Sequence, residues 1–144
     1  MSLALIGNGA SYEFRWRTWA LLRDVVVAHL DEETLPAFCS LGDAMVNNHM
    51  HVDAAQLAED VQQIRAWLVD KPFDLLVLGS RTSSLLHFTA APPTRRQLTR
   101  KEIEDIRPIA DSKDLAEYFA TMLDSMERVA QHPADDGTLE LVDG

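Results

Sequence analysis

The apolar residues of this chain recur at helical spacing in two long segments. In residues 53–69 they are separated by four, three and four positions, which places them on one face of a helix. That stripe consists of Leu57, Val61, Ile64 and Leu68. In residues 112–131 a similar stripe comprises Leu115, Phe119, Met122, Met126 and Val129, with Leu123 beside it. Each segment is therefore predicted to be an amphipathic helix that buries its apolar face.

Polar residues and prolines indicate where these and two shorter helices begin. Asp53 is a suitable N-cap, since its carboxylate can accept hydrogen bonds from the free amides of the first turn, and Gln56 completes a capping box. A helix over residues 34–46 is expected to carry Pro36 in its first turn. A further capping box predicts a short helix over residues 100–107.

Two short apolar runs predict a pair of strands. Residues 73–79 are bounded by Pro72 and Gly79, which favours a buried strand, and residues 85–88 return as its partner.

The first thirty residues fit more than one description. One apolar series has helical spacing, while another alternates with charged residues and favours a strand. The helical series is Trp19, Leu22, Val26 and Leu30, and the alternating one is Tyr12, Phe14 and Trp16. Asn8-Gly9 is in addition a strong hairpin turn signal. Residues 3–31 are therefore expected to form strand–helix–strand, a hairpin or a single helix.

Together these elements predict a mainly α protein with a minor strand pair. Residues 1–132 would form a single compact domain of four or five helices, with a short two-stranded element near residues 73–88. Residues 133–144 hold four acidic residues and no basic one, which predicts a solvated acidic tail that could include a short edge strand at 138–142.

The composition is typical of a soluble globular protein, with 47% hydrophobic and 25% charged residues. The 13 basic and 23 acidic residues give a net charge of −10, which disfavours binding to nucleic acid or to an anionic membrane. Cys39 is the only cysteine, so no intramolecular disulfide can form. The chain has neither a secretion signal nor an apolar run long enough to span a bilayer, and it is predicted to be cytoplasmic.

Gly7-Asn8-Gly9 follows the apolar run 3–6 and resembles the start of the dinucleotide-binding fingerprint. In that fingerprint, glycines let backbone amides approach a pyrophosphate at a helix N-terminus. Asp31 would then end a second strand and bind ribose hydroxyls. Tyr12 stands where the fingerprint has its third glycine. One functional alternative is therefore a small α/β nucleotide-binding protein that uses Gly7, Gly9 and Asp31.

The segment from His49 to Asp53 defines a second alternative. In an extended strand His49, His51 and Asp53 would point to the same side, and imidazole with carboxylate is a ligand set for zinc or iron. Asp53 is also the expected N-cap of the following helix, and that role uses its oxygens. The second alternative is a metal-binding protein.

Other polar features do not predict chemistry. Cys39 has apolar neighbours and no adjacent histidine, which indicates an inert thiol rather than a nucleophile. The loop 79–84 lacks the lysine and glycine spacing of a phosphate loop, and the basic stretch 95–101 lacks the aromatic residues that single-strand binding needs. No catalytic constellation is evident, so the sequence favours a protein that is not an enzyme and has no cofactor.

The leading hypothesis is a non-enzymatic protein-interaction module. Aromatic residues are concentrated at 12–19, and one helix face cannot bury them all, so some are expected at a groove or a subunit contact. They are Tyr12, Phe14, Trp16 and Trp19. The expected partner is another protein of unknown identity or a second copy of the chain, and neither nucleic acid nor a membrane.

Overall fold

The computed structural model describes residues 2–27, 30–47, 49–69, 75–77, 86–88 and 115–143. The strands and helices follow one another in the order β1 (Ser2–Ile6), β2 (Ser11–Arg15), α1 (Trp16–Val27), α2 (Pro36–Ser40), α3 (Ala44–Asn47), β3 (His49–Asp53), α4 (Ala54–Leu68), β4 (Leu75–Val77), β5 (Leu86–Phe88), α6 (Leu115–Ala130) and β6 (Thr138–Asp143). Two 3₁₀ turns, Glu32–Thr34 and Leu41–Asp43, flank α2.

The main structural feature is a four-stranded antiparallel sheet in the order β2-β1-β6-β3. The prediction of a mainly α protein with four or five helices is therefore wrong, because the fold is α+β. Within the described part of the chain, only α1, α4 and α6 exceed ten residues. The sequence indicated a strand at 138–142 and offered a hairpin as one of three alternatives for residues 3–31, but nothing in it indicated that these segments and β3 pair into one sheet.

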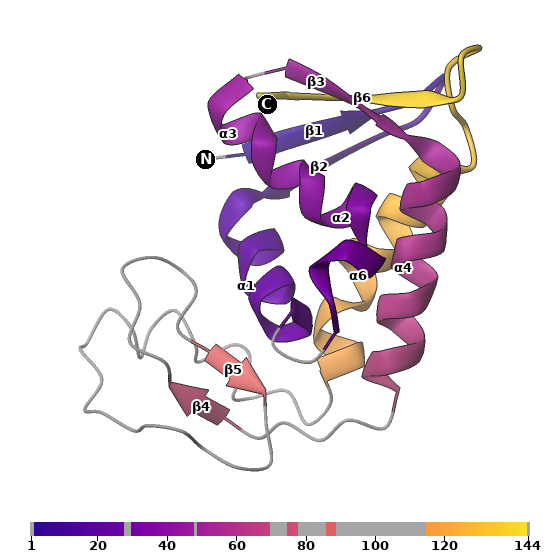
Figure 1. Ribbon diagram of the computed structural model, residues 1–144. Coiled ribbons are helices and arrows are strands. Elements are labelled where there is room, and N and C mark those ends of the chain that lie inside the picture. The colour runs from indigo at the N-terminus through magenta and orange to yellow at the C-terminus, as the bar shows by residue number, and fades with distance from the viewer. Residues whose placement is uncertain are drawn as a thin grey trace.

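The helices cover one face of this sheet. Figure 1 shows the sheet as one layer, with α1, α2, α4 and α6 all on the same side of it. Alternation along the strands explains this arrangement, since successive side chains point to opposite faces. Leu3, Leu5, Leu139 and Leu141 point to the helices and are fully buried. The other face carries the more exposed side chains of the same strands, and it holds the candidate site described below.

The acidic C-terminal segment does not remain a solvated tail. Residues Thr138–Asp143 form β6, which confirms a strand at this position but places it between β1 and β3 instead of at an edge. The segment alternates Leu139 and Leu141 with more polar residues, and burial of both leucines holds the strand in the sheet.

The N-terminal residues form a hairpin followed by a helix. Asn8 and Gly9 make the two-residue turn between β1 and β2, where Gly7 N donates to Ala10 O at 2.8 Å and Gly9 has a φ of 77°. A positive φ suits glycine because it has no Cβ. Both patterns have a structural counterpart. Tyr12 and Phe14 of the alternating series lie in β2, and Trp16 begins α1; Trp19, Leu22 and Val26 of the helical series lie in α1, and Leu30 follows its end.

The two long helices are where their apolar stripes predict them. The whole stripe of α4 is fully buried, and Asp53 caps this helix by accepting a hydrogen bond from Ala55 N at 3.1 Å. In α6 the described part of the stripe, from Phe119 to Val129, is buried as well. Arg65 of α4 joins the two helices by donating to Asp124 and Glu127 of α6.

The helix predicted over residues 34–46 is interrupted. It divides into α2 and α3, and the turn between them contains Gly42, where an added Cβ would lie 2.9 Å from the Trp19 ring. Pro36 does occupy the first turn of α2, but a distant residue supplies the cap. The buried carboxylate of Asp60, on α4, accepts hydrogen bonds from the amides of Ala37 and Phe38 at 2.8 and 2.9 Å.

The strand pair predicted near residues 73–88 is confirmed as β4 and β5, which pair antiparallel. The helix predicted over 100–107, the loop 79–84 and the basic stretch 95–101 lie outside the described residues. Among the helices that the structure describes, none is both long enough and apolar enough to cross a bilayer.

Candidate metal centre

The register between β3 and β6 brings two histidines and a glutamate together on the open face of the sheet. His49 and His51 are two positions apart on β3, so their side chains share a face. Glu140 lies directly opposite His51 on β6. The hydrogen bond from Ala54 N to Gly137 O continues the ladder and makes His51 and Glu140 a non-hydrogen-bonded pair, the arrangement in which opposite side chains are closest.

The ligand atoms of these three residues converge. Nε2 of His49 lies 2.8 Å from Oε1 of Glu140, and Nε2 of His51 lies 4.0 Å from the same oxygen. All three ligand atoms are within 4.8 Å of one another. The two imidazole rings meet edge to face with their centroids 5.1 Å apart. One imidazole nitrogen from each histidine and a carboxylate oxygen therefore surround one small volume.

These separations are close to those of a metal site. With Zn–N and Zn–O bonds of about 2.0–2.2 Å, a tetrahedral site holds neighbouring ligand atoms about 3.4 Å apart. The observed 2.8 and 4.0 Å lie on either side of that value. Small rotations of three surface side chains would equalise the distances, and the backbone of the two paired strands need not move.

The site would leave coordination positions open. The side chains of His49, His51 and Glu140 are 51%, 54% and 44% exposed, so solvent reaches the volume between them. Two histidines and one carboxylate, with the remaining positions free, are a ligand set typical of zinc and non-haem iron(II). Such a centre can bind water or an external ligand.

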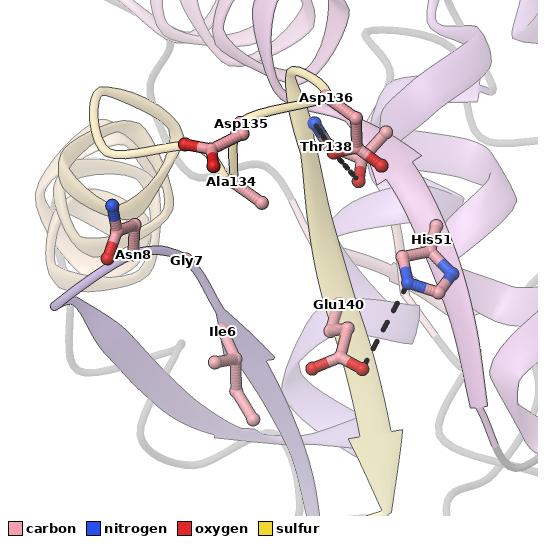
Figure 2. A pocket seen from close by; sticks show the side chains of 9 residues that line it. All are labelled: Ile6, Gly7, Asn8, His51, Ala134, Asp135, Asp136, Thr138 and Glu140. Carbon is pink, nitrogen blue, oxygen red and sulfur yellow. Dashed lines mark hydrogen bonds and ion pairs between the residues drawn. The ribbon is translucent and has the colours of Figure 1, made fainter.

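A depression of about 620 Å³ adjoins the cluster (Figure 2). Glu140 and His51 stand on one side of it, and the β1–β2 turn and the loop before β6 form the rest of its wall. Its lining residues are Ile6, Gly7, Asn8, His51, Ala134, Asp135, Asp136, Thr138 and Glu140. An external ligand on the metal would therefore have a partly walled space beside it.

Asp136 keeps this depression acidic. The hydroxyl of Thr138 donates to Oδ1 of Asp136 at 2.7 Å and the amide of Thr138 donates to the same oxygen at 3.1 Å. These hydrogen bonds hold the pKa of Asp136 below its ordinary value, and positive charge on His51 acts in the same direction. The carboxylate next to the cluster is therefore ionised at neutral pH and attracts cations.

The three residues that the sequence proposed as ligands are only partly brought together. His49 and His51 do share a face, whereas the described contacts of Asp53 are those of a helix cap, and the carboxylate of the cluster comes from Glu140. Glu140 is 91 residues from His49 in the sequence. No local pattern connects positions so far apart, and the only available signal was the alternation that marks residues 138–142 as a strand.

The residues proposed for nucleotide binding do not form the required geometry. Gly7 and Gly9 belong to a hairpin turn between antiparallel strands, while the fingerprint needs a turn from a strand into a helix. Asp31 caps the 3₁₀ turn Glu32–Thr34, where its carboxylate accepts a hydrogen bond from Glu33 N at 3.0 Å. The nucleotide-binding alternative therefore loses its structural basis.

The aromatic residues proposed for protein binding are mostly in the core. Trp19 is 0% exposed and Phe14 is 4% exposed, so neither can contact a partner directly. Tyr12 and Trp16 are half-buried against the same core, where Tyr12 stacks on Phe14 and Trp16 packs on Trp19. The interaction module stays a prediction, but its surface cannot be this cluster as a whole.

Comparison with known proteins adds no further information about this site. No protein-family model, no curated protein and no solved structure matches this chain.

Proposed function

We propose that this protein binds a divalent transition-metal ion through His49, His51 and Glu140. The observation that carries the proposal is the convergence of their three ligand atoms within 4.8 Å on two paired strands. The preferred ions are zinc and its first-row neighbours, because imidazole nitrogen favours them over calcium and magnesium. With both imidazoles neutral, the carboxylate of Glu140 gives the cluster a formal charge of −1, which attracts a divalent ion and leaves a net charge of +1 once the ion is bound.

The support is geometric as well as chemical. Neighbouring strands hold the backbones of His51 and Glu140 opposite each other, so folding prepares two of the three ligands in advance. The hydrogen bond between His49 and Glu140 holds the third ligand in the same place when no metal is bound. A prepared site loses less conformational entropy on binding than one built on a loop.

Metal binding to single-site variants tests the proposal. The protein is purified without a histidine tag, dialysed against a chelator and titrated with Zn²⁺ by calorimetry, and Co²⁺ absorption reports the coordination geometry. We expect one ion per chain, and at least tenfold weaker binding after His49→Ala, His51→Ala or Glu140→Gln. Binding should also weaken in acid, because protons compete with the metal for imidazole.

The matched control is His132→Ala, which removes an exposed histidine outside the cluster. This variant should bind zinc as the unchanged protein does. Equal weakening in His132→Ala and His49→Ala would contradict the proposal, since it would indicate unspecific binding to surface histidines. Unchanged binding in all three ligand variants would contradict it as well, provided that circular dichroism shows them to be folded.

A further inference from the structure

We infer that Asn8 is a site of spontaneous deamidation, a modification that converts its side-chain amide into a carboxylate. Asparagine reacts fastest in this way when glycine follows it, because glycine has no Cβ to obstruct the approach of its own backbone nitrogen. Of the three asparagines in the chain, only Asn8 precedes a glycine. Asn8 and Gly9 are both exposed in the turn between β1 and β2, so water reaches the reacting groups.

The reaction needs only these two residues and water. The backbone nitrogen of Gly9 attacks the side-chain carbon Cγ of Asn8, so that a nitrogen–carbon bond forms while the bond from Cγ to the amide nitrogen breaks. Ammonia leaves and takes up the proton lost from the Gly9 nitrogen. Water then opens the five-membered succinimide ring at one of its two carbonyl carbons and yields aspartate or isoaspartate. Because attacking and attacked groups belong to neighbouring residues, the first step does not require two molecules to meet.

The fold leaves both reacting groups unengaged. Among the described residues, no hydrogen bond involves the Asn8 side chain or the Gly9 amide. The hydrogen bonds of the turn are made by neighbouring groups, since Gly7 N donates to Ala10 O and Asn8 N donates to His132 O at 2.7 Å. Apart from the chain neighbours of Gly9, no described heavy atom lies within 4 Å of a Cβ added at this glycine. The succinimide ring therefore has room to form.

Asp136 and Gly137 provide an internal comparison, because aspartate before glycine can form the same ring with loss of water. Here both reacting groups already have partners. Oδ1 of Asp136 accepts hydrogen bonds from the amide and the hydroxyl of Thr138, and Gly137 N donates to Ala134 O at 2.9 Å. An ionised carboxylate is in addition a poor electrophile. Ring formation is thus open at Asn8 and hindered at Asp136, although glycine follows both.

The modification changes the depression beside the candidate metal centre, because Asn8 lines it (Figure 2). The new carboxylate adds one negative charge to a wall that already carries Asp135 and Asp136. The isoaspartate product also lengthens the backbone of the two-residue turn by one methylene group. Deamidation therefore alters both the charge of this wall and the path of the turn, and the reaction itself involves no metal.

Ageing of the purified protein at mildly alkaline pH, followed by isoelectric focusing and peptide mass mapping, tests the inference. We expect a species with one additional negative charge, release of one ammonia per chain, and both aspartate and isoaspartate in place of Asn8. The rate should be within about tenfold of that in a free peptide of residues 3–14, because the turn leaves both groups unengaged. Isoaspartate at Asp136 should form at least tenfold more slowly in the folded protein than in a free peptide of residues 131–142.

Asn8→Gln is the matched control, since it keeps an exposed amide at this position but would need a six-membered ring. Circular dichroism shows whether this variant is folded, and it should acquire no additional charge over the same period. Mapping of the modification to Asn47 instead of Asn8 would overturn the inference, and so would the same charge change in Asn8→Gln. Deamidation of Asn8 more than about tenfold slower than in the peptide would also overturn it, because the fold would then protect this turn.

Discussion

Replacement of Asp60 by alanine should be the most destabilising change of a charged residue among those that the structure describes. Asp60 is 0% exposed, and its carboxylate accepts three hydrogen bonds. Oδ2 accepts from the amides of Ala37 and Phe38 at 2.8 and 2.9 Å, and Oδ1 accepts from Nε2 of Gln56 at 2.8 Å. The two bonds from the amides attach the first turn of α2 to α4, and the bond from Gln56 lies within α4.

The magnitude follows from the groups that lose their acceptor. The amides of Ala37 and Phe38 are buried and have no other route to water, and each unsatisfied buried amide costs about 1–3 kcal/mol. Asp60→Ala should therefore lower the free energy of unfolding by about 4 kcal/mol. A loss of this size lowers Tm by roughly 10–15 °C in a chain of this length. Asp60→Asn keeps one carbonyl oxygen for the amides and should cost about 1–2 kcal/mol.

The assay is urea unfolding followed by tryptophan fluorescence and circular dichroism. Glu59→Ala serves as the control, because it removes the same charge from the exposed neighbouring position of the same helix. The free energy of unfolding of this control should differ from that of the unchanged protein by no more than about 0.5 kcal/mol. If the free energies of unfolding of Asp60→Ala and Glu59→Ala differ by less than about 1 kcal/mol, the capping role assigned to Asp60 is refuted.

Two further predictions concern the turn at Gly7 and the thiol of Cys39. An added Cβ at Gly7 would lie 2.2 Å from the carbonyl oxygen of His132, so Gly7→Ala should lower the free energy of unfolding by about 3 kcal/mol. Gly9 has open space around it but a left-handed backbone, so Gly9→Ala should lower that free energy by only about 1–2 kcal/mol. Equal denaturation midpoints for these two variants would contradict this. Burial, followed by the carboxylate of Glu32, raises the pKa of Cys39 from 9.0 to about 11, so less thiolate is present at pH 8. Reaction with a disulfide reagent at pH 8 should be about tenfold slower than in urea, because the higher nucleophilicity of a more basic thiolate partly offsets its smaller fraction, and equal folded and unfolded rates would contradict this.

Features that depend on neighbours in the chain could be predicted from the sequence. The positions of α4 and α6, the cap at Asp53 and the pairing of β4 with β5 all follow from patterns within about twenty residues. His49 and His51 could be placed on one side of the chain for the same reason, because alternation along a strand is a local property.

The fold class could not be predicted in this way. The central pairing of the sheet joins β1 to β6, which lie at opposite ends of the chain. The residue pattern of neither strand indicates which other strand it pairs with. Residues 138–143 are acidic enough to suggest a tail, and only the burial of Leu139 and Leu141 against the helices makes them a central strand.

The sequence by itself determined which segments are amphipathic and on which side of each strand or helix a given residue lies. The tertiary structure decided which of those sides meet. It brought Glu140 to the two histidines, Asp60 to the amides of α2, and the aromatic residues of α1 and β2 into the core. The physical reason is that periodicity is a property of a single segment, whereas strand register and packing arise from burial summed over segments far apart in the chain.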